Sequence, residues 1–408
     1  MDIQPILASL RKHKIPAALI VLEIALACAV LCNAVFMIGQ RIGEINLPNG
    51  MDEQGVADIR VVGTDPKLAT DDVPRNLAAL RQLPGVTAAA VINTLPLTNN
   101  GWNSNVGTQP QEVMSKDSPN VATYLFTAGG EQALGLRLLR GRFFTSEEFA
   151  DSKLGDSYVP TAHATLVTQS LAERLWPGQD ALGKQLWIGK EYHFTVVGIV
   201  ANVLRPNQNG EGLSAFHWSM FLPISPGPGG FLNDYVVRTA PQDRARVIDA
   251  AKQKLAALAP NAVVRGISFT DIRDKFFATT RSMIWMLVLV CVVMLAVTAF
   301  GIVGLTSFWV GQRRRQIGIR RAVGATRAHI MQYFQTENFL LSSAGVAAGM
   351  VLAFGINLYL MRHYQLDRMP WYYLPVSAIA LWLLGQLAVL GPALRAANVP
   401  PVVATRDG

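Results

Sequence analysis

Apolar residues in this chain of 408 residues are gathered into four long stretches. They cover residues 15–38, 283–310, 339–361 and 371–390. Each reaches the roughly 20 residues that a helix needs to cross a bilayer core about 30 Å thick. Residues 41–280, between the first two stretches, have an ordinary composition and carry most of the acidic residues. The pattern predicts a membrane protein with four transmembrane helices and one large soluble domain after the first.

The soluble segment alternates between strand and helix patterns, which predicts an α+β domain. Two β-α-β units are expected, separated by an insertion at about 100–230. A final helix at 271–282 is expected to run without interruption into the second span and to act as a rigid lever. The predicted strands are residues 58–63, 86–93, 234–239 and 262–269, and the helices of the two units are residues 74–83 and 241–260.

The formal net charge of +8 is concentrated beside the apolar stretches. Three basic residues lie within residues 1–14, six arginines lie within 313–327, and Arg395 and Arg406 follow the fourth stretch. Basic residues in short loops mark the cytoplasmic side of a membrane protein. The distribution predicts that both termini are cytoplasmic and that the soluble domain lies on the other side. It also argues against nucleic acid as a partner.

The two ends of the chain carry weaker signals. Residues 1–14 have the apolar spacing of an amphipathic helix on the inner membrane surface, with a frayed start of the first span as the alternative. The first apolar stretch is too long for the core of a signal peptide, so it is interpreted as a retained anchor. Residues 391–408 are expected to form a cytoplasmic tail.

Residues that carry chemistry are scarce. The sequence has no phosphate-binding loop, no His-Glu-x-x-His and no Gly-x-Ser-x-Gly, so no catalytic, cofactor-binding or metal-ligating residue is predicted. Cys28 and Cys32 are spaced to share a helix face, and without a third ligand nearby they are interpreted as packing residues. Glu23 is the one carboxylate in the predicted spans; a contact inside the protein is favoured over a proton-relay role.

The third span contains Gly345 and Gly349 in a Gly-x-x-x-Gly spacing. Small residues let two helix backbones approach closely in lipid. Two interpretations are open: a contact within the four-helix bundle, or a dimer interface.

The second and third spans are joined by residues 311–337, which contain the sequence RRRQIGIRRAVGATR. The longer sequence VGQRRRQIGIRRAVGATRAHIMQYFQTENFLL closely resembles the cytoplasmic loop after the second span in the FtsX-like, MacB-type ABC transporter permease family. LGLRLLRGRFFTSEE and the tail GPALRAANVPPVVATR are similar to other segments of that family. The chain departs from the family pattern at Gln316, where Glu is usual.

The resemblance implies a non-catalytic permease in the bacterial inner membrane, with a periplasmic domain made of porter-like β-α-β halves and an inserted subdomain. ATP and Mg²⁺ would be bound by a separate ABC ATPase subunit. A second permease chain, identical or paralogous, would complete the unit, and a periplasmic adaptor and an outer-membrane channel are further expected partners. The implied function is to convert ATP hydrolysis into movement of the periplasmic domain for export. The alternatives are a membrane-anchored signalling or scaffold protein and a lipoprotein-releasing permease.

The loop then divides into two expected roles. Arg313, Arg314 and Arg315 directly follow the second span and are expected to anchor the chain at membrane lipid phosphates. The rest is expected to contact the ATPase, with apolar side chains docking in a groove, glycines allowing close approach or a turn, and arginines pairing with acids. The expected ATPase-coupling residues are Gln316, Ile317, Gly318, Ile319, Arg320, Arg321, Ala322, Val323, Gly324 and Arg327.

Overall fold

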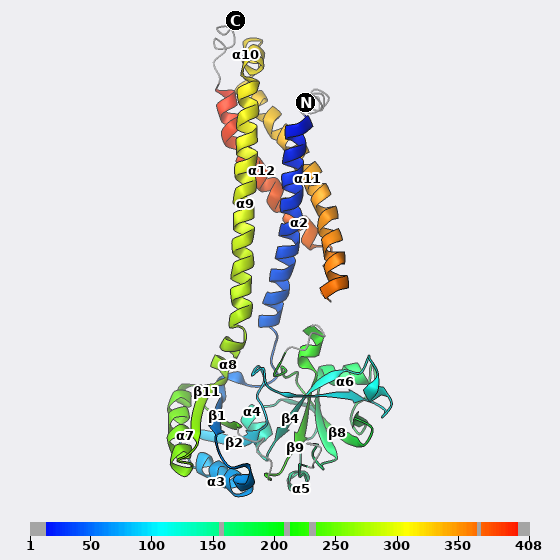
Figure 1. Ribbon diagram of the computed structural model, residues 1–408, viewed down its shortest axis with the longest axis vertical. Coiled ribbons are helices and arrows are strands. Elements are labelled where there is room, and N and C mark those ends of the chain that lie inside the picture. The colour runs from blue at the N-terminus through cyan, green and yellow to red at the C-terminus, as the bar shows by residue number, and fades with distance from the viewer. Residues whose placement is uncertain (1–13, 155–158, 208–212, 228–233, 365–368, 399–408) are drawn as a thin grey trace. The chain divides into compact units, whose positions relative to one another are not determined.

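The computed structural model describes residues 14–154, 159–207, 213–227, 234–364 and 369–398. The chain forms two compact units, Met1–Ile45 with Thr280–Gly408, and Asn46–Thr279. The first, called the helical unit, is made of long helices, and the second, called the sheet unit, is an α+β domain (Figure 1). The amphipathic helix expected near the N-terminus and the end of the expected tail lie outside the described residues.

In the described part of the chain, four helices are long and apolar enough to cross a membrane, which confirms the predicted number of spans. Each overlaps one of the predicted apolar stretches. A shorter helix, α10, connects the second to the third. The helices of this unit are α2 (Lys14–Ile45), α9 (Ala278–Gln312), α10 (Arg314–Ala322), α11 (Arg327–Tyr364) and α12 (Tyr373–Ala397).

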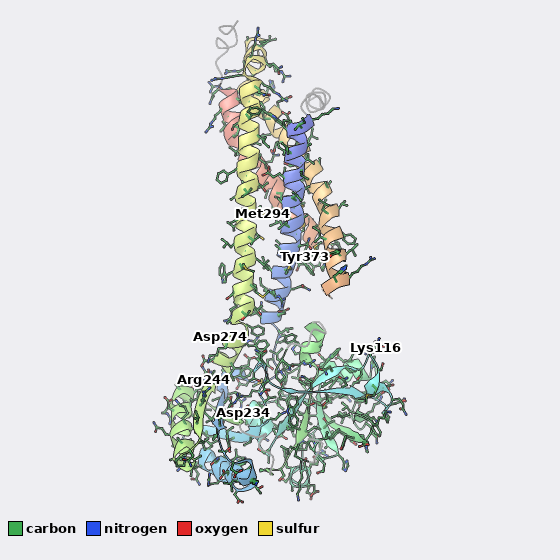
Figure 2. All side chains as sticks on the ribbon, in the orientation of Figure 1. Lys116, Asp234, Arg244, Asp274, Met294 and Tyr373 are labelled. Atoms are coloured by element: carbon green, nitrogen blue, oxygen red, sulfur yellow. The ribbon has the colours of Figure 1, made fainter. Side chains whose placement is uncertain are left out.

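The core of the helical unit lies where α2, α11 and α12 meet. Ile24 and Cys28 of α2 are buried in it with Val346 of α11. The Sγ atom of Cys28 lies 4.0 Å from that of Cys32 and 3.8 Å from the carbonyl oxygen of Val346, so both thiols are part of the helix contact. By contrast, α9 exposes large apolar side chains along most of its length, including Phe300 at 76%, and these suit a lipid environment (Figure 2).

The sheet unit is built on one 11-stranded sheet within the described residues. The strand order is β11-β1-β10-β2-β4-β3-β7-β8-β6-β9, and β5 pairs with β8. The strands are β1 (Val56–Val62), β2 (Val86–Ile92), β3 (Trp102–Gly107), β4 (Asn120–Phe126), β5 (Leu138–Gly141), β6 (Ala164–Thr168), β7 (Gln185–Ile188), β8 (Tyr192–Val200), β9 (Ser219–Pro223), β10 (Asp234–Thr239) and β11 (Val263–Ser268). The helices are α3 (Ala69–Arg81), α4 (Gly130–Leu134), α5 (Ser146–Ala150), α6 (Gln169–Leu175), α7 (Arg244–Leu258) and α8 (Phe269–Phe276).

The two predicted β-α-β units are present, and they are interleaved. β10 lies between β1 and β2 of the first unit, while β1 lies between β10 and β11 of the second. Helices α3 and α7 bury one face of these four strands, where Ile59 and Val237 pack with Leu80 and Leu255. This confirms the α+β fold class. Strands β3 to β9 come from the predicted insertion and continue the same sheet.

The last helix of the sheet unit is not continuous with α9. α8 ends at Phe276, and the next residue, Phe277, caps it with φ −88° and ψ 3° and donates its N–H to the carbonyl oxygen of Arg273 at 3.1 Å. The Phe277 ring is fully buried, and the guanidinium of Arg273 lies 5.6 Å from its centre. The predicted uninterrupted helix over residues 271–282 is therefore wrong, because the chain leaves helical geometry at this buried ring.

Two acidic residues, Asp58 and Asp234, are buried on the neighbouring strands β1 and β10. Asp58 of β1 is 4% exposed, and its Oδ1 atom has no hydrogen-bond partner among the described residues. Arg60 donates instead to Asp234 of β10, with Nε–Oδ1 and Nη2–Oδ2 distances of 2.5 and 2.7 Å (Figure 2 labels Asp234). Burial, then the charge of Asp234, raise the pKa of Asp58 to about 8, although Arg60 opposes the shift.

Replacing Asp58 by Asn should therefore change stability in a pH-dependent way. The unfolded carboxyl has a pKa of about 3.9. Since the folded pKa is higher, ionisation of Asp58 removes stability as the pH rises from about 4 through about 8. We expect D58N to gain stability over the parent on going from about pH 6 to about pH 9. Pulse proteolysis of the sheet unit in urea, on the full chain in nanodiscs, measures this; an equal difference at both pH values would contradict it.

Candidate coupling site

The segment between α9 and α11 is folded rather than an open loop. Arg313 lies between the two helices α9 and α10 with φ −96° and ψ 8°, its N–H donating to Trp309 at 3.0 Å and its carbonyl oxygen accepting from Ile317 at 2.9 Å. After α10, Gly324 adopts φ +103°, a left-handed conformation that glycine takes at little cost. α11 then begins at Arg327. α10 thus lies at the end of the helical unit where α9 ends (Figure 1).

One side of α10 is buried against its own chain. Ile317 is 5% exposed and belongs to the same apolar cluster as Ile330 and Phe334 of α11. Gly318 is buried beside it. Ile317 was predicted to dock into a partner; the structure corrects this, since its side chain fixes α10 to the helical unit instead.

The opposite side of α10 is exposed and partly apolar. Ile319 is 51% and Val323 84% exposed, and Gln316 and Ala322 are exposed as well. Positions 316, 319 and 323 follow the helix repeat, so their side chains share one face. We call Gln316, Ile319, Ala322 and Val323 the α10 stripe.

Most of the predicted arginines surround the stripe. Arg314, Arg315, Arg320 and Arg327 are exposed, and Arg321 is half-buried. The Arg320 guanidinium also lies 5.0 Å from the centre of the Tyr333 ring of α11, which holds it near its own chain. The stripe is therefore an apolar patch with a basic border.

Arg313 has a different position from its two neighbours in sequence. It is 8% exposed, and its Nη1 atom lies 3.1 Å from each carboxylate oxygen of Glu337 in α11. The guanidinium also lies 5.6 Å from the centre of the Trp309 ring. The prediction that Arg313 faces lipid phosphates is thus corrected. The physical reason is its spacing of four residues from both Trp309 and Ile317, which puts it on the buried face.

Glu337 lies within the sequence that resembles the family's cytoplasmic loop, but no sequence pattern identifies its partner. The two residues are 24 positions apart, so no local pattern joins them. A glutamate just before a long apolar run is the one available signal, because a carboxylate at that depth needs a partner. Glu23 of α2 is half-buried, and its carboxylate lies against the backbone of Gly301 in α9.

The glycines of the third span lie at a contact inside the chain. A Cβ atom on Gly349 would be 2.5 Å from the Cβ of Cys28 and 2.7 Å from the carbonyl oxygen of Ala25, both in α2. On Gly345 it would be 2.7 Å from the Cβ of Ile24. Of the two open interpretations, the structure supports the bundle contact. The dimer interpretation does not hold for these two residues, because α2 of the same chain already covers this face.

Among the described residues, no three His, Cys, Asp or Glu side chains lie close enough together to hold a metal ion. The candidate site is the α10 stripe, which Ile317 and Arg313 hold in place.

Enlarging Gly349 should destabilise the helical unit. Leu at this position would overlap α2 and cost about 1–3 kcal/mol by overpacking. Gly355 is the matched control, because no neighbouring atom lies within 4 Å of where its Cβ would be. We expect G349L to lower the unfolding temperature of the chain in detergent and G355L to leave it nearly unchanged. Equal effects of the two substitutions would contradict the close α2–α11 contact.

Comparison with known proteins gives the family. Residues 19–257 match the MacB-like periplasmic core domain, and residues 288–401 match the FtsX-like permease C-terminal family. The macrolide export ATP-binding/permease protein MacB of Bradyrhizobium diazoefficiens is 30% identical over 236 residues, covering 55% of this chain and 34% of that protein. MacB of Wolinella succinogenes is 24% identical over 349 residues, covering 81% of this chain and 48% of that protein. The periplasmic region of MacB from Actinobacillus actinomycetemcomitans is 14% identical in sequence, covering 55% of this chain and 94% of that one with a TM-score of 0.37.

The chain spans less than half the length of these two MacB relatives. The match to the periplasmic core domain alone takes in more than half of the chain. The chain therefore belongs to the family of ABC transporter permeases that combine a MacB-like periplasmic core domain with an FtsX-like permease region.

Proposed function

We propose that this chain is the permease subunit of a MacB-type export system and that the α10 stripe is the surface on which a separate ABC ATPase acts. The observation that carries the proposal is the two-sided burial of α10. Ile317 is buried in the chain's own core, while Ile319 of the same short helix and Val323, the residue that caps its C-terminus, are 51% and 84% exposed. A helix that shows apolar side chains on its free face has the composition of a docking surface.

The charge distribution supports a cytoplasmic position for this surface. The basic residues around α10 belong to a short connection between two spans, where positive charge marks the cytoplasmic side. The sheet unit would then be periplasmic and the membrane the bacterial inner membrane, with both termini in the cytoplasm. Arg314 and Arg315 are exposed and would meet lipid phosphates at the membrane surface.

The partner would supply the nucleotide chemistry. The MacB relatives are named as combined ATP-binding and permease proteins, and the present chain matches only part of their length. In this proposal a separate ABC ATPase binds ATP and Mg²⁺, and α10 contacts it through Ile319 and Val323 at the centre of the stripe and through arginines at its border. We propose export as the function because the names of these MacB relatives describe macrolide export.

The full assembly is proposed to hold two permease chains, identical or paralogous, and two ATPase subunits. Because Gly345 and Gly349 are covered by α2, a second permease would have to pair through a different face. A periplasmic adaptor and an outer-membrane channel are proposed as further partners. Hydrolysis by the ATPase would move α10, and the movement would be passed through the spans to the periplasmic domain.

Substitution of the stripe tests the proposal. I319D and V323D should each weaken binding of the ATPase by about 30-fold or more, the effect of losing an interface hot spot. The chain is purified from membranes of its source cells, and the co-purified protein is assayed for vanadate-sensitive ATP hydrolysis. H329D, at an exposed position outside the stripe, is the matched control and should retain the ATPase.

The outcome that would refute the proposal is retention of the same ATPase by I319D and V323D, with all variants inserted in the membrane to the same level. Loss of the ATPase from H329D as well would show that any added negative charge prevents binding. The effects of I319D and V323D would then not identify the α10 stripe as the binding surface.

A further inference from the structure

The ion pair between Arg313 and Glu337 has features that stability alone does not require. Glu337 is 2% exposed and Arg313 is 8% exposed, so both charges are removed from water. Arg313 Nη1 contacts both carboxylate oxygens at 3.1 Å, while Nη2 is buried without a hydrogen-bond partner among the described residues. A well-packed apolar pair in such a place is often as stable as an ion pair or more stable. The charges therefore call for a second explanation.

The position of the pair within the chain supplies one. α10 is attached to the rest of the helical unit by two joints, the non-helical residue Arg313 before it and Gly324 at φ +103° after it. Bending at these joints would let α10 tilt while α9 and α11 stayed still. Arg313 belongs to the first joint, and its side chain is fixed to Glu337 in the third turn of α11. The ion pair thus connects the chain before α10 directly to α11, and both joints lie within the segment that it closes.

Two further contacts stiffen the same region. The Trp309 ring of α9 is 4% exposed and lies beside the Arg313 guanidinium, and Ile317 of α10 packs in the cluster that contains Phe334 of α11. Arg313 consequently contacts both the end of α9 and a buried side chain in the third turn of α11. A displacement of α10 is then passed to both spans instead of being absorbed by bending.

We propose that Arg313 and Glu337 are positioning residues that make α9, α10 and α11 move together when a partner acts on the α10 stripe. The inference rests on the proposed function, since the force on α10 comes from the ATPase. The buried pair determines how much of the movement caused by ATP hydrolysis is transmitted to the transmembrane helices. The α10 stripe determines whether the ATPase binds.

Two separate measurements distinguish these roles. The full chain is placed in nanodiscs with the ATPase that co-purifies with it, and the hydrolysis rate is measured against permease concentration. R313K and E337Q should lower the maximal stimulation by about 5-fold or more, within the usual range of coupling between sites. The half-saturating concentration should stay close to that of the parent, because the stripe is unchanged. The charge-reversed pair R313E with E337R should recover part of the stimulation.

A matched control and an ATPase-free measurement complete the design. R395K makes the same chemical change at an exposed position of α12, outside the α10 stripe and its basic border, and should leave stimulation unchanged. Hydrogen exchange of the α10 backbone amides, recorded without ATPase, should be faster in R313K and E337Q than in the parent and R395K.

The proposal would be overturned if R313K and E337Q stimulated the ATPase as fully as the parent, or if they changed only the half-saturating concentration. Exchange in α10 that is the same in all variants would overturn the connection itself. If the parent chain did not stimulate ATP hydrolysis, both the proposed function and the proposed transmission of movement through the pair would fail. Hydrogen exchange of the α10 amides would still show whether the pair holds α10 in place.

Discussion

The helical unit depends on one constraint: a charged side chain within a buried helix contact must have a partner of opposite charge. Arg313 meets this constraint through Glu337, and in doing so it determines which face of α10 is buried and which is free. With Arg313 and Ile317 turned inward, the helix repeat necessarily turns Ile319 and Val323 outward. The exposed stripe is therefore a geometric consequence of the buried pair. Loss of one partner would leave an uncompensated buried charge, at a cost of about 3–5 kcal/mol.

Much of the fold is predictable because it follows from local pattern. The four spans are recognised from long apolar runs, and the strands β1, β2, β10 and β11 from β-branched residues between helix patterns. Their interleaving into one sheet is not predictable in the same way, because it depends on pairing between segments far apart in sequence. The break at Phe277 was missed for a similar reason. The residues around Phe277 are compatible with a continuous helix. Nothing in the local sequence shows that the Phe277 ring is buried in the sheet unit and that α8 ends just before it.

The candidate site was only partly predictable. The sequence located α10 and the glycine after it, since apolar and small residues alternate there with arginines. It did not separate Arg313 from Arg314 and Arg315, because three consecutive arginines are locally equivalent and tertiary packing alone selects the one that is buried. The Gly345–Gly349 motif shows the same limit. Small residues predict close helix contact, and only the three-dimensional arrangement identifies α2 as the neighbour.

In the proposed mechanism, the Arg313–Glu337 pair fixes α10 to α11. The most direct measurement is the distance between spin labels at R315C on α10 and F339C on α11, by pulsed electron paramagnetic resonance in nanodiscs. The three native cysteines, Cys28, Cys32 and Cys291, would first be replaced by alanine. If the pair holds α10 against α11, the distance distribution is single and narrow, becomes broad when E337Q is added, and narrows again in the charge-reversed pair. A distribution equally narrow with E337Q would contradict this mechanism.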